Sequence, residues 1–200
     1  MLKIKAILDK YSVYCDEARH GKAFEGLLNR YFKGWRNPQQ DPTALFNLSY
    51  GLFILTAKDD EGKDNGCIIN TAFQVANDPT KIAISCQMGN LTREIIEKTG
   101  KFNLSVLTQS LPFETVKHFG MQSGRDVNKF NGFDAVKRSS NDLYYITENT
   151  NAFFSCEVKE KLNLGSHMLF IGEVKESAVL SKEPSCTYAH YHKAIKKKFN

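Results

Sequence analysis

The amino-acid sequence predicts one mainly β domain with flanking helices. Short apolar segments rich in β-branched and aromatic residues recur along the chain, separated by glycine, asparagine, aspartate and proline. A length of 200 residues with 42% hydrophobic and 12% aromatic content suits one such domain with a full core. The local order of strand, turn and strand favours antiparallel pairing.

Residues 1–36 precede this domain and have the apolar spacing of two short helices. A DNA-binding helix-turn-helix is one alternative, but the second helix carries aromatic residues that favour burial over polar residues that read a groove. Packing against the β domain or a partner subunit is the favoured interpretation. The prolines of residues 37–42 mark a linker. We therefore expect a helical extension and linker over 1–42, a main domain over 43–192 and a basic tail over 193–200.

The main domain divides into strands and one central helix. The expected strands are residues 48–56, 67–73, 81–86, 102–107, 153–159 and 168–179. An acidic turn at residues 58–62 follows the first strand, and a turn containing Gly165 separates the last two. Asn90 is expected to cap a helix that begins at Leu91 and ends at Gly100.

The stretch from Asn65 to Pro79 is the most informative part of the chain. An Asn-Gly pair tolerates positive φ, so Asn65 and Gly66 are expected to close a hairpin. The apolar strand that follows carries an amide at Asn70 and a hydroxyl at Thr71, and such groups need partners when buried. A strand of this kind presents its backbone to a planar ligand.

The cysteines and the apolar runs exclude several classes of protein. The five cysteines are widely and irregularly spaced, which argues against a disulfide framework and against a metal site. Four are interpreted as buried small hydrophobes, while Cys67 either fills its turn or approaches a ligand. No apolar run approaches the roughly 18–20 residues that cross a bilayer, and no signal-peptide core is visible. A cytoplasmic protein without membrane contact is expected.

The charge distribution and the glycines exclude two further classes. The net charge of +5 is concentrated in the lysines near the C-terminus, without an aromatic stacking platform beside them. A solvated tail is favoured, and nucleic-acid binding is not expected. The Gly-rich fingerprint of a dinucleotide-binding Rossmann fold is missing.

Three further motifs follow the Asn65–Pro79 stretch, over residues 90–96, 119–130 and 165–174. Together these segments resemble the flavin reductase-like family of FMN-binding split barrels, and the resemblance runs from about residue 44 to 192. The similarity is greatest to the flavin domain of rubredoxin-linked NADH oxidoreductases, which share the Ile-x-Asn-Thr run and the Tyr-x-x-Tyr-His ending. No rubredoxin domain is expected, because the cysteines form no Cys-x-x-Cys pairs to hold iron.

The resemblance implies a six-stranded antiparallel split β-barrel with flanking helices. It also implies FMN as the cofactor, NADH or NADPH as the co-substrate, and a homodimer that builds the flavin pocket from both subunits. The implied activity is that of an NAD(P)H-dependent flavin reductase, a flavoprotein oxidoreductase that passes a hydride to flavin and on to an acceptor. The acceptor, the choice between NADH and NADPH, and whether FMN is cofactor or substrate stay open.

The resemblance further implies which residues hold the cofactor. The ring is expected along one strand and its neighbour, at Cys67, Ile68, Ile69, Asn70, Thr71, Ala72, Phe73 and Ser85. The phosphate is expected at the start of the helix, at Asn90, Leu91, Thr92 and Arg93. Anion contacts are expected from the Gly-Arg-Asp loop, at Ser123, Gly124, Arg125 and Lys129. His167 is the candidate catalytic residue, with a positioning role beside the nicotinamide.

These residues also fit structural roles. Asn90 and Thr92 suit an ordinary helix cap, and the Gly-Arg-Asp loop suits a solvated turn stiffened by an ion pair between Arg125 and Asp126. His167, beside an apolar strand, suits a structural role.

Three positions depart from the family pattern. Ser166 stands where many relatives carry an aspartate that would orient the histidine ring. Ile68 and Ala76 replace hydroxyl-bearing residues of many relatives. The last two departures remove two hydroxyl contacts that would help to distinguish FMN from FAD.

Two functions of other classes are compatible with the same residues. One is a flavin-bearing electron carrier that a redox partner protein reduces, with little nicotinamide activity. The other is a non-redox binding module in which residues 1–36 recruit a partner. Comparing the rates of reduction by NADH and by a redox protein distinguishes the electron carrier from a reductase. Deleting residues 1–36 and measuring flavin reduction distinguishes the binding module from a reductase.

Overall fold

The computed structural model describes residues 42–195. The chain divides into two compact units, residues 50–191 and residues 1–49 together with 192–200. A 3-10 helix, η2 (Pro42–Asn47), belongs to the second unit, and a π-helix, η3 (Tyr191–Ile195), ends the described chain. The two helices predicted within residues 1–36, and most of the basic tail, lie outside the described residues.

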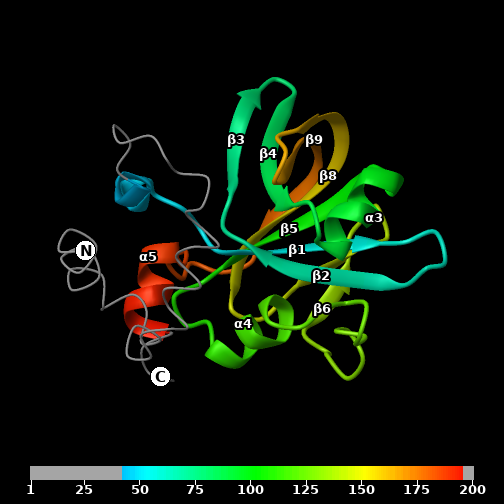
Figure 1. Ribbon diagram of the computed structural model, residues 1–200. Helices are drawn as coiled ribbons and strands as arrows, with labels where there is room; N and C mark the ends of the chain where they lie inside the picture. The colour runs from blue at the N-terminus through cyan, green and yellow to red at the C-terminus, as the bar shows by residue number, and fades with distance from the viewer. Residues whose placement is uncertain (1–41, 196–200) are drawn as a thin grey trace, which may run out of the picture. The chain divides into compact units, whose positions relative to one another are not determined.

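The unit of residues 50–191 is built on an antiparallel sheet of seven strands in the order β2-β1-β5-β8-β9-β4-β3 (Figure 1). The strands are β1 (Phe53–Lys58), β2 (Asp64–Ile69), β3 (Ala72–Asn77), β4 (Thr80–Gln87), β5 (Lys101–Leu107), β8 (Thr150–Asn163) and β9 (His167–Val179). The edge strands β2 and β3 are consecutive in the chain, and only Asn70 and Thr71 separate them. The sheet therefore curves so that the end of β2 and the start of β3 lie together at one corner, and the predicted mainly β fold is confirmed.

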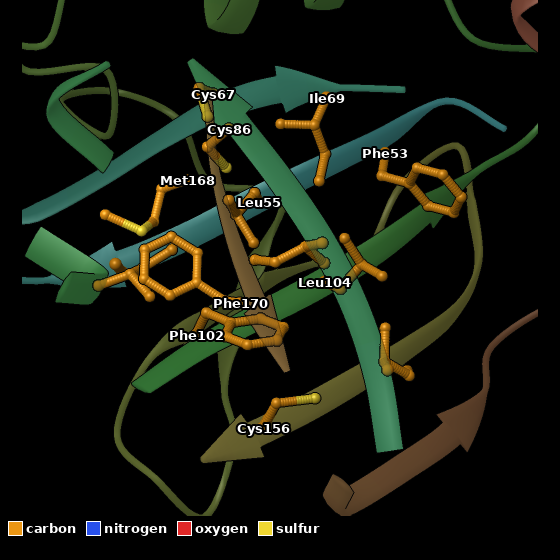
Figure 2. Packing of buried hydrophobic residues seen from close by; sticks show 14 of the residues in the cluster. Phe53, Leu55, Cys67, Ile69, Cys86, Phe102, Leu104, Cys156, Met168 and Phe170 are labelled. Carbon is orange, nitrogen blue, oxygen red and sulfur yellow. The ribbon is translucent and has the colours of Figure 1, made fainter. Parts of the chain in front are cut away.

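Apolar side chains fill the inside of this curved sheet (Figure 2). Leu55, Ile84, Phe102 and Phe170 come from four different strands and are each 0% exposed. Burying a side chain of this size contributes about 1.5–3 kcal/mol. Gly172 on β9 leaves room for one of these rings, because a Cβ at this position would lie 2.6 Å from Phe102.

In the described part of the chain, three α-helices accompany the sheet. They are α3 (Leu91–Thr99), α4 (Phe113–Gly120) and the single turn α5 (Tyr188–His190). The predicted caps of α3 are confirmed, since Asn90 Oδ1 accepts a hydrogen bond from the Thr92 backbone N–H at 2.8 Å and Gly100 has a φ of 70°. Helix α4 was not predicted; it buries Val116 and Phe119.

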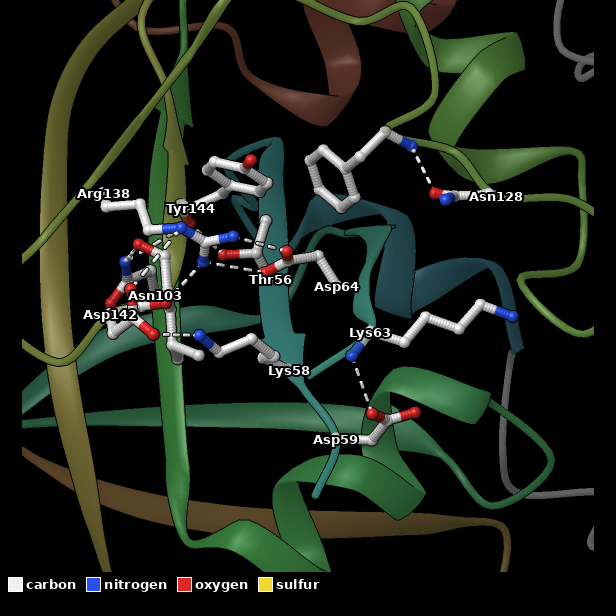
Figure 3. Close-up of polar contacts among 12 residues, drawn as sticks. Thr56, Lys58, Asp59, Lys63, Asp64, Asn103, Asn128, Arg138, Asp142 and Tyr144 are labelled. Carbon is white, nitrogen blue, oxygen red and sulfur yellow. Dashed lines mark hydrogen bonds and ion pairs between the residues drawn. The ribbon is translucent and has the colours of Figure 1, made fainter. Parts of the chain in front are cut away.

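A second, two-stranded sheet of β6 (Val136–Arg138) and β7 (Tyr144–Ile146) is tied to β5 by a buried polar network. The carboxamide of Asn103, which is 0% exposed, donates to Ser139 Oγ at 2.7 Å and to the Leu143 carbonyl at 3.0 Å. Figure 3 shows Asn103 among the charged residues of this region, where Arg138 pairs with Asp64 at 2.7 Å. The hairpin thus depends on polar contacts as well as on packing.

Replacing Asn103 by alanine is expected to lower the free energy of unfolding by about 2–3 kcal/mol, because buried partners lose their hydrogen bonds. Urea unfolding followed by circular dichroism measures this loss. Lys137→Ala, at an exposed position on β6, is the matched control and should change stability by less than about 0.5 kcal/mol. A loss of that smaller size for Asn103→Ala would contradict the role given to the network.

The predicted hairpin at Asn65 and Gly66 is wrong. The turn between β1 and β2 is made by residues 59–63, where the Asp59 N–H donates to the Lys63 carbonyl at 3.0 Å and Gly62 has a φ of 83°. Asn65 and Gly66 lie within β2 instead. Turn propensity was overridden at this pair because the Asn65 side chain is bonded inside the protein and Gly66 lies against the Phe119 ring, 3.3 Å from where a Cβ would be.

The predicted count of six strands in the sheet is not confirmed, since the structure has seven. Residues 67–73, predicted as one strand, are interrupted at Asn70 and Thr71, where the Thr71 hydroxyl donates to Asn70 Oδ1 at 3.2 Å. The first strand also begins later than predicted, at Phe53.

Candidate functional site

A cavity of about 690 Å³ lies within the unit of residues 50–191. Its volume is within the range of roughly 300–1,000 Å³ that is usual for small-molecule sites. Most of the predicted site residues line it: Cys67, Ile68, Ile69, Asn70, Ser85, Asn90, Leu91, Thr92, Ser123, Gly124, Lys129 and His167. The structure therefore gathers residues from β2, β4, the start of α3, the Gly-Arg-Asp loop and the start of β9 around one space.

The remaining predicted residues, Thr71, Ala72, Phe73, Arg93 and Arg125, do not line the cavity. The interruption of the strand after Asn70 separates β3 from β2, and the Phe73 side chain on β3 is 57% exposed. The wall that faces the cavity is therefore β2 and not the whole predicted segment.

The two arginines are held by carboxylates outside the cavity lining. The Arg93 guanidinium contacts Glu97 and donates to the Met88 carbonyl at 2.5 Å. Arg125 donates to Glu94 at 2.7 Å, and this hydrogen bond lowers the pKa of the Glu94 carboxyl below its ordinary value. The loop is stiffened by an ion pair, as the structural alternative expected, but the partner is Glu94 and not Asp126.

One end of the cavity is formed by the first turn of α3. The Asn90 side chain caps this turn, and the Thr92 side chain is fully buried while lining the cavity. The N-terminus of a helix carries a partial positive charge and unpaired N–H groups. This end of the cavity therefore favours an anion.

Lys129 contributes a full positive charge to the cavity wall. Its side chain is 3% exposed, and its Nζ donates to the Gly66 and Phe119 carbonyls at 2.9 Å each. Removal from water lowers its pKa below the ordinary value of 10.5. The residues that line the cavity include no aspartate, glutamate or arginine, so no carboxylate there neutralises this ammonium. A buried cation in this setting favours an anionic ligand.

His167 lies on β9 opposite Gln87 on β4, and both line the cavity. The Ser166 hydroxyl lies 2.9 Å from His167 Nδ1. The Ser166 hydroxyl therefore makes the contact with the ring that the aspartate of many relatives is expected to make. Nε2 is the ring nitrogen left for a ligand in the cavity.

The four cysteines in the described part of the chain are free and buried. Two of them, Cys67 and Cys86, also line the cavity. Burial raises the pKa of the Cys67 thiol, against the opposing effects of Thr92, Asn90 and the charge of Lys129. In residues 42–195 no group of three His, Cys, Asp or Glu side chains is arranged to hold a metal ion.

The sequence interpretation missed several lining residues, including Asn65, Phe119, Met121 and Tyr188. Phe119 and Met121 lie in a motif that the sequence did single out, but no chemistry there pointed to them. Asn65 was assigned to a turn. An asparagine near the start of β2 could have been identified as a cavity residue only with knowledge of where α3 packs.

Comparison with known proteins decides the family. A family model described as a flavin reductase like domain matches residues 45–197. The chain belongs to the flavin reductase-like family. The resemblance found in the sequence is therefore confirmed.

Two curated proteins illustrate how this flavin reductase-like chain is related to others. It is 40% identical over 152 residues to a high molecular weight rubredoxin of Moorella thermoacetica, covering 76% of this chain and 66% of that protein. It is 32% identical over 152 residues to a ferric-chelate reductase (NAD(P)H) of Archaeoglobus fulgidus, covering 76% and 89%. The chain thus spans just under two thirds of the length of the Moorella relative.

Solved structures show the same fold at lower identity. An FMN-binding protein from Thermus thermophilus has a TM-score of 0.63 and 21% identity, covering 72% of this chain and 78% of that one. An NADH:FAD oxidoreductase from Streptomyces globisporus has a TM-score of 0.67 and 17% identity, covering 77% and 95%. None of the helices described for the flavin reductase-like chain has the length and apolar character needed to span a membrane.

Proposed function

We propose that the protein is an FMN-binding oxidoreductase that transfers a hydride from NADH or NADPH to flavin and on to an acceptor. The observation that carries this proposal is the buried Lys129 ammonium, which lines the same cavity as the N-terminus of α3 without a carboxylate in the lining. A phosphate monoester matches this end, and the planar ring of FMN matches the β2 wall. The names of the relatives, a ferric-chelate reductase (NAD(P)H) and an NADH:FAD oxidoreductase among them, support the reaction class.

In this proposal each part of the cavity has one task. The first turn of α3, the Thr92 hydroxyl and the Lys129 ammonium hold the phosphate. The β2 backbone from Cys67 to Asn70, with Ser85 opposite, positions the ring. Bound flavin supplies the hydride chemistry. His167, held by Ser166, positions the nicotinamide at the open side of the ring.

We further propose that the protein works as a homodimer in the cytoplasm. Phe73 and Val75 on β3 are 57% and 44% exposed, which supports a protein surface that another subunit covers. The four free, buried thiols support a reducing compartment.

An electron carrier reduced by a protein donor is the second candidate. It is favoured by the 40% identity to a protein named as a rubredoxin. The same cavity would hold the flavin, and the partner would be a redox protein. The difference lies in the source of electrons.

One experiment tests both candidates. The protein loaded with FMN is mixed with NADH or NADPH under anaerobic conditions, and bleaching of the flavin absorbance is followed by stopped flow. If the protein is a reductase, NADH or NADPH should bleach the flavin within the time of one catalytic turnover. Slow bleaching by both nicotinamides and fast bleaching by reduced rubredoxin would support the carrier, and failure to bind FMN would contradict both.

The affinity for FMN is expected to fall as the pH rises toward 10. Burial lowers the pKa of Lys129 below the ordinary lysine value of 10.5, so the ammonium loses its proton at a lower pH than an exposed lysine does. Only the protonated form attracts the phosphate. Calorimetric titration between pH 7.5 and 10 measures the effect. Riboflavin, which shares the ring but has no phosphate, controls for titration of the ring and of Cys67. An equal fall in affinity for both ligands would contradict the assignment.

A further inference from the structure

The wall of the cavity contains a buried hydrogen bond between two side chains. Asn65 Nδ2 donates to Thr92 Oγ1 at 3.0 Å. Asn65 is 4% exposed and Thr92 is 0% exposed, and both line the cavity. In the proposed function the Thr92 hydroxyl contacts the phosphate of the ligand. Asn65 contacts that hydroxyl and so lies directly behind it.

The direction of this hydrogen bond decides what the Thr92 hydroxyl can do. A threonine hydroxyl has one hydrogen to donate and lone pairs that accept. Because Asn65 donates to Oγ1, the hydroxyl hydrogen is directed away from Asn65. The backbone N–H of Thr92 is already bonded to Asn90 Oδ1 at 2.8 Å, so the hydroxyl is the donor that Thr92 offers to the cavity. Within the protein this hydroxyl opposes the rise in the pKa of the neighbouring Cys67 thiol, and an anionic ligand would compete with that thiol for its hydrogen.

The carboxamide of Asn65 is also confined on the side of the Gly-Arg-Asp loop. A Cβ built on Gly124 would lie 2.1 Å from Asn65 Oδ1, so the loop backbone packs directly against the amide oxygen. Only glycine allows this approach. The loop therefore holds Asn65 in the position from which it reaches Thr92.

We propose that Asn65 is a positioning residue for phosphate recognition, because it turns the Thr92 hydroxyl into a donor toward an anion at the start of α3. The buried Lys129 ammonium lines the same cavity, so a phosphate monoester there meets N–H groups, a directed hydroxyl and a cation. The inference rests on the proposed function, which supplies FMN as the phosphate monoester. It adds a residue that sets the preference for FMN over riboflavin.

A double-mutant cycle tests this inference. The dissociation constants of FMN and riboflavin are measured by fluorescence quenching for the unchanged protein, Asn65→Ala, Thr92→Val and the double variant. Each single substitution is expected to lower the preference for FMN about tenfold, as for the loss of one hydrogen bond to a charged group. The double variant is expected to lose no more than either single one, because Asn65 acts through the hydroxyl. Thr92→Ser, which keeps the hydroxyl, should retain the preference.

Specific outcomes overturn the inference. They are an unchanged FMN preference in Asn65→Ala, equal weakening of both ligands, or fully additive losses in the double variant. If Asn65→Ala does not fold, the isosteric Asn65→Asp replaces it; its carboxylate takes the Thr92 hydrogen, so the preference should fall at least tenfold, and an unchanged preference overturns the inference. Failure of the proposed function is distinguishable, because the unchanged protein would then bind no FMN.

Discussion

Lys129→Met is expected to lower the preference for FMN over riboflavin about a hundredfold. The substitution removes the ammonium of the one lysine in the described cavity lining, which contains no arginine, aspartate or glutamate. Methionine keeps a long side chain of similar shape. Removing one partner of a buried, hydrogen-bonded charge pair costs about 2–5 kcal/mol. Isothermal titration with FMN and with riboflavin measures the preference.

Arg125→Met is the matched control for this charge. Arg125 belongs to the same loop, but it pairs with Glu94 and does not line the cavity. We expect its replacement to leave the preference for FMN within about twofold of the unchanged protein, since it removes only a screened surface ion pair. Equal losses in the two variants would mean that the net charge of the region, and not the buried ammonium, attracts the phosphate.

Gly172→Ala is expected to lower the free energy of unfolding by about 3 kcal/mol. The new Cβ would lie 2.6 Å from the Phe102 ring and 3.0 Å from the Cys156 Cβ. Overpacking of a filled core costs about 1–3 kcal/mol or more, and Phe102 is 0% exposed, so the ring has no solvent-filled space to enter. Denaturant unfolding measures the loss.

Gly89→Ala is the control for the loss of a glycine, because a Cβ there meets nothing within 4 Å. Its unfolding free energy should stay within about 0.5 kcal/mol of the unchanged protein. A second substitution, Phe102→Leu, should recover part of the stability lost in Gly172→Ala by removing the atoms in conflict. A normal stability for Gly172→Ala alone would show that the packing around β9 is looser than described.

The parts of the fold with local signals were predictable from the sequence. Asn90 and Gly100 marked the two ends of α3 because a cap and a left-handed residue are properties of a few neighbouring positions. The apolar segments of β4, β5 and β9 were found for the same reason. The identity of the cavity residues on β2 and α3 came from the family resemblance and not from local pattern.

Long-range contacts account for what the sequence did not predict. Asn65 and Gly66 have the composition of a turn, but they lie in β2 because Thr92 and Phe119 meet them there. Lys129 was expected to contact an anion of the cofactor from a loop, and only the approach of the Gly66 and Phe119 carbonyls shows that it is buried. A local sequence pattern does not indicate where a partner ten or more residues away will lie.

The ratio of the dissociation constants of riboflavin and FMN for the unchanged protein tests the central claim most directly. The claim is that the cavity at the start of α3 and Lys129 binds a flavin through its terminal phosphate. We expect FMN to bind about a thousandfold more tightly than riboflavin, because the buried ammonium and the Thr92 hydroxyl are expected to contribute about a hundredfold and about tenfold. Equal binding of the two flavins would contradict the claim.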